Sequence, residues 1–303
     1  MACCIPIPSR QAGKTVAALA VCLSIAACEQ DSPAPREAVT LQPTPAGDYR
    51  WRDAAGHLYG DDFRAAYTYD RARVTVTFAP HGAVLAGTLE AAGLKPNFAY
   101  QFKLDGLPEE DPEANERLGL TGRWWEQVWD AAPGAWSAGG NLNDKGDGTS
   151  PNPNDRTYLD RRDAPDPGSP SGRRYRYTGY RVLDGFVTDS AGGATLPFVE
   201  DASWHVLWRT DQREPAAGDG PVKTATFDPT PGPDSAYAAD YPPASVTIYG
   251  EWERLPAGGI RLPPGVYRLR FLLTEESFHG VDGELSGSWA HALAAPFEFT
   301  VDD

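Results

Sequence analysis

The chain has 303 residues, 42 of them acidic and 27 basic, which gives a formal charge of −15. This length allows one large domain or two smaller ones. The acidic charge, with no basic cluster to offset it, argues against nucleic-acid binding and against electrostatic adsorption to anionic membranes. Its 31 Gly and 28 Pro predict many turns, while nine Trp and thirteen Tyr indicate a chain that folds around a core.

Residues 1–27 have the pattern of a signal peptide for export. Arg10 and Lys14 precede the apolar run Thr15–Ala27, as the charged and hydrophobic regions of such a leader do. The run is too short to span a bilayer, because a transmembrane helix needs about 20 apolar residues. We therefore expect the leader to be removed and the rest of the chain to be exported.

The end of this run, Leu23-Ser-Ile-Ala-Ala-Cys28, resembles the lipobox of bacterial lipoproteins, in which a hydrophobic residue and small residues precede a cysteine. The resemblance implies that the leader is cleaved before Cys28 and that this residue carries two or three acyl chains, enough for stable anchoring. Glu29 stands where an aspartate would favour inner-membrane retention, so we expect the outer membrane of a bacterial envelope. The alternative is an ordinary signal peptide with a chance cysteine.

The mature chain would be more acidic than the whole, with 25 basic and 42 acidic residues and a formal charge of −17, because the leader holds two basic residues and no acidic one. The four cysteines, Cys3, Cys4, Cys22 and Cys28, lie at or before the cleavage point, so the body has no disulfide and depends on its core. Residues 28–63 are predicted to be a Pro-rich tether and lead-in.

Beyond the tether, apolar residues alternate with polar ones, which is typical of half-buried strands. Val74, Val76 and Phe78 form one such series, and Phe98, Tyr100, Phe102 and Leu104 form another. The pattern recurs at 180–188, 195–198, 204–208, 246–252, 267–273 and 297–301. The best helix signal is residues 111–118, with Asp as N-cap and Pro in the first turn. The predicted fold class is all-β: one or two antiparallel β-sandwich units with long loops and very little helix.

Two segments support the sandwich. Leu94-Lys-Pro-Asn-Phe-Ala-Tyr100 resembles the tyrosine corner of fibronectin type III and immunoglobulin-like domains, and Leu262-Pro-Pro-Gly-Val-Tyr267 resembles a second corner. In such a corner the tyrosine hydroxyl bonds back to the nearby backbone. Two corners predict a first sandwich at 64–213, with a long loop at 134–173, and a linker plus second sandwich unit at 214–303. Shared sheets would blur that boundary.

The most conspicuous candidate site is a group of tryptophans, Trp124, Trp125, Trp129 and Trp136. Flat indole faces beside carboxamides and carboxylates suit sugar rings, whose C–H faces stack while their hydroxyls bond to polar neighbours. The alternative is that these side chains fill the core, since Trp is mostly buried in folded proteins. The sequence leaves both readings open.

A second candidate is a calcium site at Asn143, Asp144 and Asp147, where oxygen ligands lie on a Gly-bearing loop. Lys145 interrupts the ligand pattern, and a solvated turn is the alternative. No zinc spacing, nucleophile elbow or phosphate loop is present, and Glu275–His279 has acid–base groups that also fit an exposed strand end.

The sequence therefore favours a non-enzymatic, lipid-anchored envelope protein whose body binds a surface partner, such as a glycan or an envelope protein, or serves structurally. A carbohydrate-active module, glycan-binding or glycoside-cleaving, is the alternative, since the catalytic carboxylates of such enzymes need not be close in sequence. The membrane is expected as a partner only through the lipid anchor.

Overall fold

The computed structural model describes residues 35–45, 47, 49–142, 153–201, 204–209, 219–227, 236–252, 261–276 and 289–303. Strands account for 48% of the structure and helices for 13%, and the large antiparallel sheets are open. The predicted all-β sandwich is therefore confirmed. Residues Pro35–Asp303 form one compact unit.

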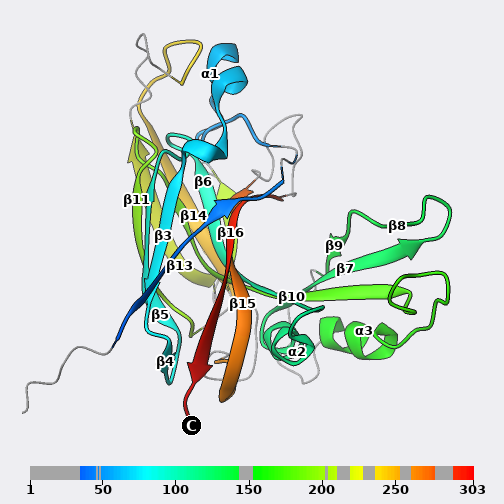
Figure 1. Cartoon of the computed structure of the whole chain (residues 1–303). Helices are drawn as coiled ribbons and strands as arrows, with labels where there is room; N and C mark the ends of the chain where they lie inside the picture. Colours follow the sequence, from blue (N-terminus) through cyan, green and yellow to red (C-terminus); the bar gives the residue numbers. More distant parts are fainter. Residues whose placement is uncertain are drawn as a thin grey trace, which may run out of the picture. The chain divides into compact units, whose positions relative to one another are not determined.

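The residues that the structure describes form three sheets (Figure 1). The four-stranded sheet has the order β1 (Glu37–Thr40), β3 (Arg73–Phe78), β5 (Ala86–Ala92), β11 (Ala194–Val199). The large sheet has the order β2 (Gln42–Pro43), β16 (Trp289–Val301), β15 (Gly265–Glu276), β6 (Ala99–Gly106), β10 (Tyr175–Val187), β7 (Arg123–Asp130), β8 (Ala135–Trp136), with β4 (His81–Gly82) beside β16 and β9 (Gly140–Asn141) beside β7. The three-stranded sheet has the order β12 (Trp204–Arg209), β14 (Ala244–Trp252), β13 (Asp219–Phe227).

Among the described residues, the helices are α1 (Asp61–Ala66), α2 (Pro112–Leu120) and α3 (Pro153–Arg161), with a 3-10 turn at Tyr69–Arg71. The helix predicted at 111–118 is confirmed, because the Asp111 side chain accepts a hydrogen bond from the Ala114 N–H at 3.0 Å and so caps α2. The prediction of one long loop at 134–173 is corrected, because this segment contains β8, β9 and α3. No helix in the described ranges has the length and apolar character needed to cross a membrane.

The main core lies between the four-stranded sheet and the large sheet. The alternating residues Val74, Val76 and Phe78 of β3 are fully buried, as their spacing predicts. Aromatic rings join the two sheets: Phe78 lies 5.4 Å from Phe271 of β15, measured between ring centroids. Phe102 of β6 likewise packs edge to face on Phe198 of β11 at 5.1 Å. Period-two patterning in distant segments thus forms one continuous core.

Strands from both predicted sandwich units share the large sheet. β15 pairs with β6, with Leu269 opposite Gly106 and Glu275 opposite Tyr100. The predicted boundary between residues 213 and 214 lies outside the described residues. Part of the predicted tether also joins the body, since β1 pairs with β3 and β2 pairs with β16.

Both predicted tyrosine corners have the expected hydrogen bond. The Tyr100 hydroxyl accepts from the Lys95 N–H at 3.2 Å, and the Tyr267 hydroxyl donates to the Pro263 carbonyl at 2.5 Å. Each bond ties the start of a central strand to the turn before it. The resemblance of the whole body to fibronectin type III or immunoglobulin-like domains stays a prediction.

Candidate functional site

The site lies where the pairing between β6 and β10 of the large sheet ends. β6 pairs with β10 as far as Asp105, which is opposite Tyr180, and the chain then leaves the sheet after Gly106. Toward its N-terminal end, β10 stays paired with β7 as far as Tyr175, which is opposite Val128. Figure 1 shows this part of β10 and β7 extending away from the four-stranded sheet, with α2 and α3 beside it. One edge of β10 between residues 175 and 179 is therefore not paired with β6.

Helix α2 lies against this edge. The Asn115 side chain donates to the Tyr177 carbonyl at 3.2 Å and accepts from the Gly179 N–H at 2.8 Å, so it satisfies backbone groups that a neighbouring strand would otherwise bind. A Cβ atom on Gly179 would lie 2.4 Å from the Asn115 carbonyl oxygen, and one on Gly106 would lie 2.1 Å from its Oδ1. Glycine at these two positions is what allows the helix to approach.

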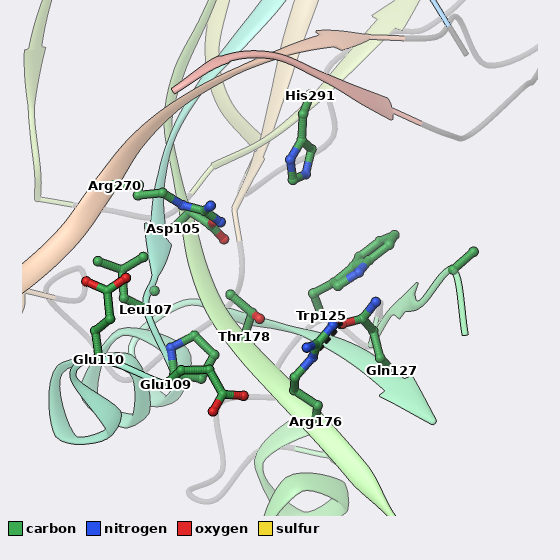
Figure 2. A pocket seen from close by; sticks show the side chains of 13 residues that line it. Asp105, Leu107, Glu109, Glu110, Trp125, Gln127, Arg176, Thr178, Arg270 and His291 are labelled. Atoms are coloured by element: carbon green, nitrogen blue, oxygen red, sulfur yellow. Dashed lines mark hydrogen bonds and ion pairs between the residues drawn. The ribbon is translucent and has the colours of Figure 1, made fainter. Parts of the chain in front are cut away.

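A pocket of about 530 Å³ opens on the face of the sheet beside this edge (Figure 2). We call it the Trp125 pocket. Its size is within the range of small-molecule sites. Five strands and two loops contribute to its lining: Asp105, Gly106, Leu107, Pro108, Glu109, Glu110, Trp125, Gln127, Ala138, Arg176, Thr178, Arg270 and His291.

Two arginines in the pocket are held in place by neighbours. Arg270 forms an ion pair with Asp105 from the adjacent strand. The Arg176 Nε donates to the Gln127 Oε1 at 2.8 Å, and the Gln127 Nε2 donates in turn to the Ser137 carbonyl at 2.9 Å. Because these contacts fix both guanidinium groups before any ligand arrives, little entropy would be lost on binding.

Acid and base groups in the pocket are perturbed by their surroundings. Burial raises the pKa of Asp105, and the nearby Arg270 partly opposes that rise. Burial of the His291 ring, together with the nearby cations Lys103 and Arg270, lowers its pKa to about 4. His291 is therefore neutral near pH 7, where it can both donate and accept hydrogen bonds.

The structure separates the four predicted tryptophans. Trp124 is fully buried on the opposite face of β7 from the pocket; its indole stacks on Tyr158 at 3.8 Å and its Nε1 donates to Asp155 at 3.0 Å. Trp124 therefore packs inside the protein beneath α3. Trp129 and Trp136 are half-buried and pack edge to face, with 5.4 Å between centroids. The four indoles do not share one plane.

Trp125 is the one of these four that lines the pocket. It is half-buried, and Figure 2 shows its indole on the same side of the pocket as Gln127 and Arg176. It is opposite Thr178 in the β7–β10 register, so both side chains face the same side of the sheet. An apolar ring face is thus surrounded by hydrogen-bonding groups.

A second hollow, of about 640 Å³, lies on the other side of the same edge. We call it the Tyr175 hollow. Its lining shares Pro108, Glu109 and Arg176 with the Trp125 pocket. The remaining lining residues are Pro112, Asn115, Glu116, Tyr158, Arg162, Asp163, Ser171, Arg173, Tyr175 and Tyr177.

Other predicted sites fall elsewhere. Cys28 and the calcium candidates Asn143, Asp144 and Asp147 lie outside the described residues. Within the ranges that the structure describes, no group of three His, Cys, Asp or Glu side chains is placed to hold a metal ion. Glu275 does not lie at an exposed strand end, because it is fully buried against Lys95 at 2.5 Å.

Sequence reasoning missed the polar residues of the Trp125 pocket. Asp105 and Arg270 each lie at a polar position of a strand in which polar and apolar residues alternate. This alternation was the sequence signal that could have pointed to them. That pattern identifies two faces for each strand but does not show which strands become neighbours. The pocket forms only because β6, β10 and β15 are adjacent.

The arrangement suits reversible binding of a polar ligand that has an apolar face. Trp125 offers a ring for stacking, and Arg176, Arg270 and His291 offer hydrogen bonds at its rim. Comparisons of the chain with protein families, with characterised proteins and with solved structures find no match in any of the three.

Proposed function

We propose that the mature protein is an exported, lipid-anchored envelope protein whose β-sandwich body is a non-enzymatic binding module, with the Trp125 pocket as its ligand site. The leader and the lipobox-like segment before Cys28 support the anchoring. The observation that carries the binding proposal is the half-buried Trp125 indole in a pocket whose arginines are already oriented.

The ligand class that best fits this pocket is a glycan. The formal charge of −17 on the predicted mature chain disfavours a strongly anionic ligand. Within the pocket, the pairing of Arg270 with Asp105 and the exposed Glu109 and Glu110 balance its cations. A neutral sugar ring can stack on Trp125 and bond to the polar groups around it.

A glycan array with purified wild-type protein tests this proposal. We expect binding that Trp125→Ala weakens at least about tenfold, because loss of about 1.4 kcal/mol changes affinity by that factor. Val199→Ala serves as the control, since Val199 is an exposed apolar residue on β11, outside both pockets. Equal binding by wild-type protein and Trp125→Ala would exclude this pocket as the glycan site.

Glycoside cleavage is the second candidate function. Asp105 is a buried carboxyl group with a raised pKa at the pocket, and Glu109 and Glu110 supply further carboxylates. Cleavage requires one carboxyl as acid and a second as base or nucleophile. Release of reducing sugar by the wild-type protein and not by Asp105→Asn would favour an enzyme over a binding module.

Anchoring has a separate test. We expect wild-type protein expressed in a bacterium to partition with membranes and to incorporate labelled palmitate. Cys28→Ser should lose the label and appear in the soluble fraction, because the thiol is the predicted acylation site. Unlabelled wild-type protein in the soluble fraction would contradict the proposal.

A further inference from the structure

We propose that the ligand is a linear glycan of several units that extends from the Trp125 pocket past Arg176 into the Tyr175 hollow. This inference rests on the proposed glycan-binding function and adds the length and path of the ligand. It assigns a second subsite around Tyr175, which sequence patterns did not indicate.

The two hollows meet at one place. Pro108, Glu109 and Arg176 line both of them, so the Trp125 pocket and the Tyr175 hollow adjoin on either side of these residues. Figure 2 shows Glu109 and Arg176 on opposite sides of the lower part of the Trp125 pocket. A chain that occupies both hollows would cross the edge of β10 at these side chains.

The size of the hollows favours an extended ligand. Each one, at about 530 Å³ and 640 Å³, is by itself large enough for a drug-sized molecule. A single sugar ring would leave most of this space to water. A chain of several rings would exclude that water and bury more of its surface.

The second hollow repeats the chemistry of the first. Tyr175 lines it with a half-buried ring that stacks on Tyr177 at 6.1 Å and lies 5.5 Å and 5.7 Å from the guanidinium groups of Arg161 and Arg174, measured from the ring centroid. An ion pair between Arg162 and Glu116 lies at the same hollow, as Asp105 and Arg270 do at the first. A polymer presents the same groups repeatedly, and two similar subsites match that repetition.

The separation of the two rings also suits a chain. Trp125 is opposite Thr178, and Tyr175 lies three residues farther along β10. Three strand residues span about 10 Å, and the two rings emerge on opposite faces because side chains alternate. One small ring cannot contact both Trp125 and Tyr175, whereas an oligomer that crosses the edge of β10 can.

Calorimetry with oligomers of increasing length tests the inference. The probes are β-1,4-linked oligomers of glucose and of N-acetylglucosamine and α-1,4-linked oligomers of glucose, each from one to six units. For the wild-type protein we expect affinity for at least one series to rise at least tenfold between two and five units. Val199→Ala is the control and should behave like the wild-type protein.

Two variants of the second subsite separate a binding role from a structural one. Tyr175→Ala should remove the gain with length but leave the affinity for the shortest binding oligomer unchanged. Tyr175→Phe should keep the gain, because it keeps the ring. Trp125→Ala should weaken binding of every length.

The outcomes distinguish failure of this inference from failure of the function. Length-independent binding that Trp125→Ala abolishes would overturn the second subsite and leave the Trp125 site standing. A gain with length that Tyr175→Ala retains would also overturn it. No binding of any oligomer by the wild-type protein would overturn the proposed function and this inference together.

Discussion

At the scale of single residues, the most unusual group is the fully buried Lys95. Its ammonium group contacts the Glu275 carboxylate at 2.5 Å and lies 4.1 Å from the centroid of the Trp51 ring and 4.7 Å from that of Phe98. Burial lowers the pKa of Lys95 to about 8, although Glu275 favours the charged form. Cation–π contacts and the ion pair together replace the water that this group loses.

Both carboxylate oxygens of Glu275 also have hydrogen-bond partners. One carboxylate oxygen accepts from the Arg50 N–H at 2.6 Å, and the other accepts from the Tyr69 hydroxyl and from Lys95. Lys95 follows β5 and Glu275 lies near the end of β15, so the pair joins segments 180 residues apart. Removal of one partner leaves the other as a buried, uncompensated charge.

We therefore expect Lys95→Met to lower the free energy of unfolding by about 3–5 kcal/mol, measured by urea denaturation. The double variant Lys95→Met/Glu275→Gln should be less destabilised than the sum of the two single variants, because it leaves no unpaired charge. Strict additivity of the single effects would show that the two groups do not interact.

Glu200 gives a prediction about pH. Burial raises its pKa to about 7, against the opposing effect of Arg181, with which it forms a fully buried ion pair. Since the folded pKa exceeds the unfolded value of about 4.3, the folded state binds more protons between these limits. The stabilisation from this group is complete below about pH 4.3 and is lost as the pH rises through 7.

The free energy of unfolding of the wild-type protein should therefore fall between pH 5 and 7.5 relative to that of Glu200→Gln, by on the order of 2–3 kcal/mol. Glu90→Gln is the matched control, because Glu90 is exposed on β5. Parallel pH profiles for wild-type protein and Glu200→Gln would contradict the assignment.

At the scale of elements, the contact between α2 and β10 positions both hollows. The loop that lines them, residues 107–110, ends where Asp111 caps α2. Asn115 then holds the helix to the edge of β10. Any change that moves α2 should also move the walls of the Trp125 pocket.

Gly179→Ala tests this contact. The added methyl group would lie within 2.4 Å of the Asn115 carbonyl, so we expect a loss of about 1–3 kcal/mol in the free energy of unfolding. Gly140→Ala is the matched control, since its Cβ would meet no atom within 4 Å. Equal thermal stability of the two variants would contradict the close approach of helix and strand.

Strand β6 is buried on both faces, which its alternating pattern does not predict. In β6, Phe102 and Leu104 face the core as their spacing predicts, but Gln101 and Lys103 on the polar side are buried as well. The three-stranded sheet explains part of this, because Val246 of β14 packs with Tyr180 and Val182 of β10 on that side. A pattern within one strand cannot show that a third sheet covers its polar face.

At the scale of the whole molecule, the C-terminal strands are interior parts of the large sheet. β15 lies between β6 and β16, and it brings Leu269, Phe271 and Leu273 to the main core. We therefore expect the fragment 64–213 to lack a cooperative thermal transition by circular dichroism. Mixing it with the fragment 214–303 should restore the transition, whereas cooperative unfolding of 64–213 alone would show that it is an independent domain.

The sequence by itself determined the features that depend on neighbouring residues: the positions of most strands, the start of α2 at its Asp111 cap, and the hydrogen bonds of the two tyrosine corners. These follow from side-chain alternation and short-range hydrogen bonding, which act within a few residues. Only the tertiary structure decided that Trp124 is buried while Trp125 lines a pocket, and that Asp105 meets Arg270. Those contacts depend on strand order in the large sheet, which brings together residues far apart in the chain.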